Sequence, residues 1–295
     1  MAPEWTASRA GSAETCSSNP ERTGRDGFLG LRFERRNGKT ALCQCRFRLP
    51  LQALTPVELD DGAAYLLLLN PTGGVVGGDL LLTHIAQQEC THVCLSTPSA
   101  TRIYRTLAQP AVQETRVRVG AESSFEYLPD HVIPYRDSEF RQSLRVHMER
   151  GSRVIVWDAI AAGRIAHGER WDFRDFDSVI EISLKGVPIF YNRTRIHPAE
   201  LDPERLGFGE GFNYLATLIV IADEFRSWTT LLAAMNLELT KLSGVYGGAS
   251  LLRRSGCVVK LMARSAAELM DAQAALWGLA RQFVLGCAPL DLRKY

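Results

Sequence analysis

Residues 90–94 place two cysteines and a histidine at alternating positions, Cys90, His92 and Cys94, and His84 lies shortly before them. On a strand, alternate side chains point to the same face of the sheet, so the three would gather on one side. Thiolate and imidazole are ligands that Zn²⁺ and Ni²⁺ accept. A lone Cys-x-His-x-Cys, however, lacks the paired spacing of a structural zinc site. The segment is therefore open to two interpretations, a metal site or a buried strand.

Carboxylates and a histidine in other segments could do general acid–base chemistry. Asp79 ends a glycine-rich run, and Glu169 lies in residues 166–171. His131 follows Asp130 in a segment typical of a turn. A carboxylate and a histidine that reach one substrate can transfer protons, which leaves open a β-rich hydrolase or isomerase that uses Asp79, His131 and Glu169. The sequence contains neither a Gly-x-Ser-x-Gly elbow nor a His-Glu-x-x-His motif.

The run 70–79, NPTGGVVGGD, contains two glycine pairs, Gly73-Gly74 and Gly77-Gly78. Such pairs are typical of backbone with positive φ, or of a close approach by another part of the chain. Asn-Pro begins turns, and apolar segments of strand length flank the run. A phosphate-binding loop would need a Gly-Lys-Ser/Thr end or a following helix N-terminus, and the sequence offers neither. The run is therefore predicted to be a tight loop between two strands.

Short apolar or alternating segments recur along most of the chain and are predicted to be strands. The pattern begins near Phe28 and turns at Asn37-Gly38, a hairpin signal that places Cys43 and Cys45 on the apolar face. The other predicted strands are 65–69, 80–85, 91–95, 115–119, 124–128, 140–148, 154–159, 179–184, 187–192, 214–222, 249–252 and 257–261. Glycine turns that precede apolar strands favour a mainly β fold of stacked β layers, which is β-solenoid-like.

Two helices are predicted near the C-terminus, at about 227–243 and 266–285. In the first, Leu231 and Met235 recur at helical spacing, and the second begins with a capping box of Ser265 and Glu268. Residues 1–26 are rich in small and polar residues and are predicted to be a disordered tail. Residues 27–295 are predicted to form a single β-rich domain.

Composition limits the range of functions. The 295 residues are 46% hydrophobic and 23% charged, and the net charge of +1 provides no general attraction to nucleic acid or an anionic membrane. The longest apolar runs are too short to cross a bilayer. Seven cysteines, an odd number, and the lack of an apolar signal segment after the start predict a reducing cytoplasm.

Four motifs stand in order along the chain. They are NPTGGVVGGD at 70–79, STPSATRIYRT at 96–106, EYLPDHVIPY at 126–135 and WDAIAAGRIAHGERW at 157–171. Together they resemble the urease accessory protein family UreD, called UreH in some organisms. The resemblance extends from about Gly30 to the C-terminus and implies a non-catalytic chaperone of urease maturation.

The resemblance also implies roles for three polar residues. Asp79, Arg102 and Glu169 resemble family positions placed along an internal passage or at a partner interface. Arg102 stands where lysine is expected, and His167 precedes Gly168 where arginine is usual. Family members often have a glutamate near the position of His131, so this sequence departs from the family pattern there.

The partners implied by the resemblance are UreF, UreG and apo-urease (UreABC). A UreD-type scaffold would bind apo-urease and UreF, which carries the GTPase UreG, in a complex with several copies of each partner. GTP hydrolysis by UreG would accompany nickel insertion. The scaffold itself would hold no tightly bound cofactor, only a nickel ion in transit.

Overall fold

The structure is a computed structural model that describes residues 25–200, 205 and 208–292. The predicted disordered tail, 1–26, lies outside this part except for its last two residues, and Asp26 already begins the first strand.

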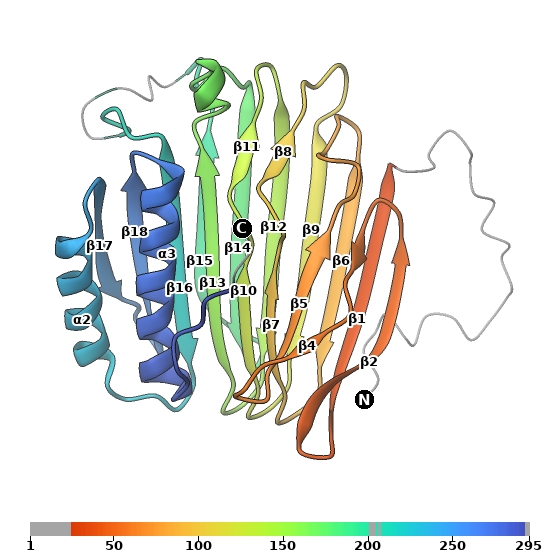
Figure 1. Cartoon of the computed structure of the whole chain (residues 1–295), viewed down its shortest axis with the longest axis vertical. Helices are drawn as coiled ribbons and strands as arrows, with labels where there is room; N and C mark the ends of the chain where they lie inside the picture. The colour runs from red at the N-terminus through yellow and green to blue at the C-terminus, as the bar shows by residue number, and fades with distance from the viewer. Residues whose placement is uncertain (1–24, 201–204, 206–207, 293–295) are drawn as a thin grey trace, which may run out of the picture.

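Two β-sheets make up most of the described chain (Figure 1). The seven-stranded sheet has the order β15 (Val187–Ile196), β14 (Asp175–Leu184), β12 (Glu139–Met148), β9 (Ala111–Val119), β6 (Leu80–Gln87), β1 (Asp26–Arg36) and β2 (Lys39–Arg48). The eleven-stranded sheet has the order β17 (Val245–Leu251), β18 (Gly256–Ala263), β16 (Tyr214–Ala222), β13 (Arg153–Ala161), β10 (Ser124–Leu128), β7 (His92–Ser96), β5 (Ala64–Leu69) and β3 (Gln52–Ala53). Its short side strands are β4 (Val57–Glu58), β8 (Thr101–Ile103) and β11 (Val132–Pro134).

The chain winds between the two sheets as a solenoid. It passes from β5 to β6, from β7 to β9, from β10 to β12 and from β13 to β14, and changes sheet at each step. Within each sheet the successive coils pair in parallel. Strands β2, β15 and β16 add antiparallel neighbours at the ends of the stack. The predicted architecture of stacked β layers is therefore confirmed.

Two helices cover the outer face of the eleven-stranded sheet at its C-terminal end (Figure 1). They are α2 (Trp228–Lys241) and α3 (Ala266–Ala280), and α3 continues as the π-helical turn η3 (Arg281–Leu285). The capping box forms as predicted, since the backbone N–H of Glu268 donates to Ser265 Oγ at 3.2 Å and that of Ser265 donates to Glu268 Oε2 at 2.8 Å. Within the described residues, no helix has both the length and the apolar character needed to cross a membrane.

The prediction that Cys43 and Cys45 face the core was wrong. Both lie on β2, the edge strand of the seven-stranded sheet, where Cys45 is exposed and Cys43 only partly buried. The N-terminal hairpin itself forms, with a register shift between Arg32 and Phe33. Arg32 pairs with Gln44 and Phe33 with Leu42, so Cys43 is an extra residue in β2 and the alternation of faces is interrupted there.

Candidate functional site

The four sequence motifs form successive connections between coils. Residues 70–79 join β5 to β6, and the other three motifs join the following pairs of strands in the same way. Backbone hydrogen bonds tie neighbouring connections together: Val75 N–H donates to Arg102 O at 2.8 Å, and Tyr135 N–H donates to Ile103 O at 2.9 Å. The rings of Tyr104 and Tyr135 also meet edge to face at 5.2 Å. Motifs far apart in sequence thus stack at one end of the solenoid.

The glycine-rich loop needs glycine for both of the predicted reasons. Gly73 and Gly78 have positive φ, +79° and +89°. A Cβ on Gly74 would lie 2.5 Å from the Tyr104 ring, and one on Gly77 would lie 2.9 Å from a backbone carbonyl oxygen. Each pair therefore combines one glycine that turns the chain with one that admits a neighbouring connection.

Asp79 closes this loop. Its side chain is 6% exposed, and its Oδ2 accepts a hydrogen bond of 2.8 Å from the backbone N–H of Val76. Its backbone carbonyl accepts from Val112 N–H on β9 at 2.8 Å. Burial raises the pKa of the Asp79 carboxyl group, although the backbone hydrogen bond works in the opposite direction. The carboxylate thus holds the loop in shape at some electrostatic cost.

Arg102 lies beside the glycine loop. It is an exposed residue of β8 and lines a cavity of about 150 Å³ together with Gly73 and Gly74. The structure therefore brings Arg102 and the glycine motif together.

Glu169 is an ion-paired carboxylate. It is 6% exposed, and Arg164 binds it through two nitrogens, with Nε at 2.8 Å from Oε2. The Arg164 guanidinium also lies over the Tyr135 ring, 4.3 Å from its centroid. The hydrogen bond from Arg164 lowers the pKa of Glu169, so this carboxylate stays ionised and paired.

The acid–base residues Asp79, His131 and Glu169 have separate environments. The His131 ring packs edge to face on Tyr214 at 5.2 Å, and burial lowers the pKa of its imidazole. Among the described residues, no hydrogen bond or ion pair joins any two of the three. The geometry therefore offers no shared acid–base centre.

The expectation that Cys90, His92 and Cys94 share one strand face was wrong. Cys90 is an exposed turn residue with φ +56°, outside β7, so the alternation begins only at His92. Cys94 is fully buried in the core beneath the helices. His92 Nε2 lies 2.7 Å from Oε1 of Glu126 on the neighbouring strand β10.

A row of polar side chains crosses the inner face of the seven-stranded sheet, and the sequence analysis missed it. Gln113, Gln142, Ser178 and Thr194 are register partners on β9, β12, β14 and β15. From the facing sheet, Asp158 on β13 accepts hydrogen bonds from Gln142 Nε2 at 2.9 Å and from Ser178 Oγ at 3.1 Å. Burial raises the pKa of Asp158 despite these donors. The available signal was a single acidic residue within the apolar run 154–161.

Apolar clusters lie on both sides of this polar row. One, which includes Leu144 and Ile180, fills the space between the sheets toward one end of the strands. The other, which includes Phe140 and Phe176, fills it toward the end that carries the four motifs. The polar row is therefore a separate layer within a hydrophobic interior.

Three cavities lie along the polar layer and share lining residues. The cavity of about 150 Å³ at the glycine loop shares Gln113 and Tyr127 with a cavity of about 50 Å³. This small cavity shares Asp158 with an open cavity of about 630 Å³ that reaches Lys260 and Gly247. Neighbouring cavities thus have common walls, and the smallest lies at Asp158.

Comparisons with known proteins agree with the sequence motifs. The profile described as UreD urease accessory protein matches residues 25–294. A urease accessory protein UreD of Mycolicibacterium gilvum is 34% identical over 252 residues, which cover 84% of this chain and 90% of the relative. A protein of the same name from Herpetosiphon aurantiacus is 32% identical, and the match covers 91% of this chain and 96% of the relative. One from Lachnoclostridium phytofermentans is 30% identical, and the match covers 91% of this chain and 98% of the relative.

Proposed function

Because the chain belongs to the UreD urease accessory protein family, we propose that it acts in urease maturation as a non-catalytic scaffold. In this proposal it binds apo-urease (UreABC) and UreF, and UreF carries the GTPase UreG, which supplies GTP hydrolysis. The complex works in the cytoplasm. The four motifs stack side by side at one end of the solenoid, and the exposed Arg102 lies there beside the glycine loop. We place the contact with a partner at this end.

The polar layer is the proposed route for nickel. Ni²⁺ accepts carboxylate, amide oxygen and water ligands, and transfer requires weak successive sites in preference to one tight cage. A buried carboxylate is costly unless it is paired or hydrated. Asp158 receives two hydrogen bonds from neutral side chains and lines two cavities. Asp130 also lines the smaller of the two, so a passing cation would meet two carboxyl groups in the smallest cavity. This continuous polar layer is the observation that carries the proposal.

Urease activity in cells is the direct test. Cells would carry the urease subunits, the other accessory proteins and nickel, with or without this chain. We expect urease activity only when the chain is present. Equal activity without it would refute the maturation role, and the isolated chain would then be screened for hydrolase or isomerase turnover.

Two substitutions at Asp79 separate its charge from its role in the loop. Asp79→Asn keeps an oxygen acceptor for Val76 N–H, whereas Asp79→Ala leaves that partly buried donor without its partner, at a cost of about 1 kcal/mol. We expect only Asp79→Ala to lower the free energy of unfolding, as measured by denaturant titration. If the charge also takes part in nickel transfer, both variants will lower urease activation while the complex still assembles. Full urease activation with Asp79→Asn would show that the charge of Asp79 takes no part in nickel transfer and that the residue only stabilises the loop.

A further inference from the structure

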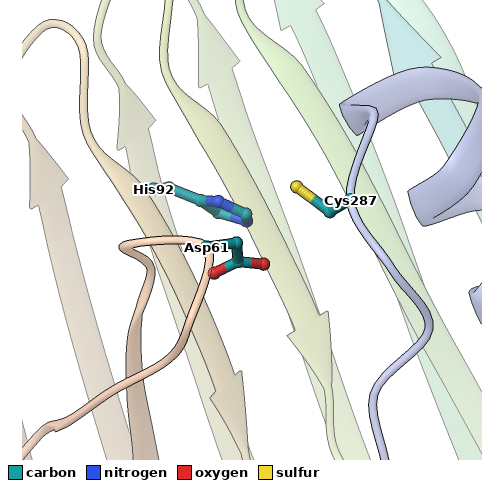
Figure 2. Close-up of side chains that lie close together, drawn as sticks. All are labelled: Asp61, His92 and Cys287. Atoms are coloured by element: carbon teal, nitrogen blue, oxygen red, sulfur yellow. The ribbon is translucent and has the colours of Figure 1, made fainter.

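Three potential metal ligands from distant parts of the chain meet at one point. Asp61 lies in the turn between β4 and β5, His92 begins β7, and Cys287 follows η3 in the C-terminal segment. Their ligand atoms all lie within 4.8 Å of one another. Figure 2 shows the three side chains pointing toward a common space.

This cluster lies on the opposite side of the eleven-stranded sheet from the polar layer. Along β7, Cys94 packs with the helices, whereas Val93 packs between the sheets. His92 is two residues before Cys94, so it shares the helix-covered face. In Figure 1 the C-terminal segment after α3 crosses in front of the same sheet, on the face that the helices cover. The cluster is therefore separate from the proposed nickel route.

A fully buried carboxylate orients the histidine. Glu126 Oε1 lies 2.7 Å from His92 Nε2, and Glu126 Oε2 accepts from Trp277 Nε1 at 2.5 Å. With Nε2 held by Glu126, Nδ1 is the ring nitrogen whose lone pair is available to a metal ion. A carboxylate behind a ligating histidine fixes its tautomer and strengthens it as a ligand.

The surrounding charges suit a divalent cation. Arg281 is fully buried and forms ion pairs with both Asp61 and Glu126. Two carboxylates and one guanidinium leave one negative charge in excess. A Cys287 thiolate would add a second, and a divalent ion would balance both.

We propose that Asp61, His92 and Cys287 bind one divalent metal ion of the zinc class, with water as the fourth ligand. Sulfur, nitrogen and oxygen donors together are the ligand set that Zn²⁺ accepts in tetrahedral sites, at about 2.0–2.3 Å from the metal. Side-chain movements of about 1 Å bring the three ligand atoms to such distances. The bound ion ties the C-terminal segment to the β4–β5 turn and to β7.

Cobalt(II) titration of the purified full chain tests this site. Co²⁺ occupies zinc sites and gives a thiolate-to-metal absorption band when cysteine is a ligand. We expect the band to saturate at one equivalent and to disappear when Zn²⁺ is added. Cys287→Ser removes the band and weakens Zn²⁺ binding by at least about tenfold. Cys45→Ser, which changes an exposed thiol on β2, leaves both unchanged.

Asp61→Asn provides an independent variant, because the amide oxygen can still accept from Ala63 N–H, which lies 3.0 Å from Asp61 Oδ1. We expect it to weaken Zn²⁺ binding while circular dichroism stays native. The proposal is overturned if the natively folded chain gives no thiolate–cobalt band, or if the band survives Cys287→Ser.

Discussion

Replacing Asp158 by asparagine is expected to lower urease activation by about tenfold or more and, at neutral pH, to stabilise the chain. Asparagine has nearly the same shape and still accepts a hydrogen bond from Gln142 or Ser178, but it carries no charge. Activation falls because the smallest cavity loses one of the two carboxyl groups that line it. Stability rises because the partly buried charge no longer has to be accommodated.

The stabilising effect of Asp158→Asn depends on pH in a defined direction. Burial raises the pKa of Asp158 in the folded chain, so the folded state binds the proton more tightly than the unfolded state. The free energy of unfolding of the wild type therefore decreases as pH rises from the unfolded pKa, about 4, through the raised folded value. The asparagine variant lacks this loss. Its advantage over the wild type should be near zero in acid and largest at neutral pH.

Two measurements check these expectations for Asp158. Denaturant unfolding across pH gives the difference in stability, and urease activity in nickel-supplied cells gives the activation. Asp60→Asn, in an exposed turn, is the matched control and should change neither. Unchanged activation with Asp158→Asn would show that the route does not use this carboxylate. A loss of stability at neutral pH would make Asp158 a structural residue.

The largest loss of stability is expected from Arg281→Met. This substitution leaves Glu126 fully buried without its cationic partner and also removes the ion pair with Asp61. Breaking one side of a buried ion pair costs about 3–5 kcal/mol, because the remaining charge is uncompensated. Denaturant unfolding of the full chain measures the loss. Arg254→Met, on an exposed residue, should stay within about 0.5 kcal/mol of the wild type.

A double variant tests the cause of this loss. Adding Glu126→Gln to Arg281→Met removes the unpaired charge, and the amide oxygen of the new glutamine side chain can still accept from Trp277. The double variant should therefore be less destabilised than the sum of the two single variants. Simple additivity, or a loss below about 1 kcal/mol for Arg281→Met alone, would show that the carboxylate is hydrated or paired elsewhere.

Local patterns predicted much of the fold. The strands at 124–128 and 214–222 match β10 and β16 residue for residue, because each is a segment rich in apolar residues and bounded by turn residues. Both helices were predicted because a capping signal or a 3.6-residue period marks them. The glycine pairs were also informative, since their conformations follow from having no Cβ.

The candidate sites were harder to predict from the sequence, because they depend on strand register and on contacts between distant segments. Asp158 meets Gln142 only because the two sheets pack face to face, which no local pattern specifies. The predicted place of Cys90 in the alternation was wrong, because its backbone has a positive φ and turns there. His92 was among the predicted candidates, but its neighbours Asp61 and Cys287 come from remote parts of the chain.

The polar row also fixes how the length of the proposed passage can vary. Each of β9, β12, β14 and β15 contributes one residue, and neighbouring strands are about 4.8 Å apart, so the row spans three intervals, or roughly 14 Å. A whole added coil would extend the row by one interval and keep its width. A single residue inserted within a strand would instead turn its polar side chain to the outer face and interrupt the row. Such a passage can therefore lengthen only by whole strand-to-strand intervals, while its width stays the same.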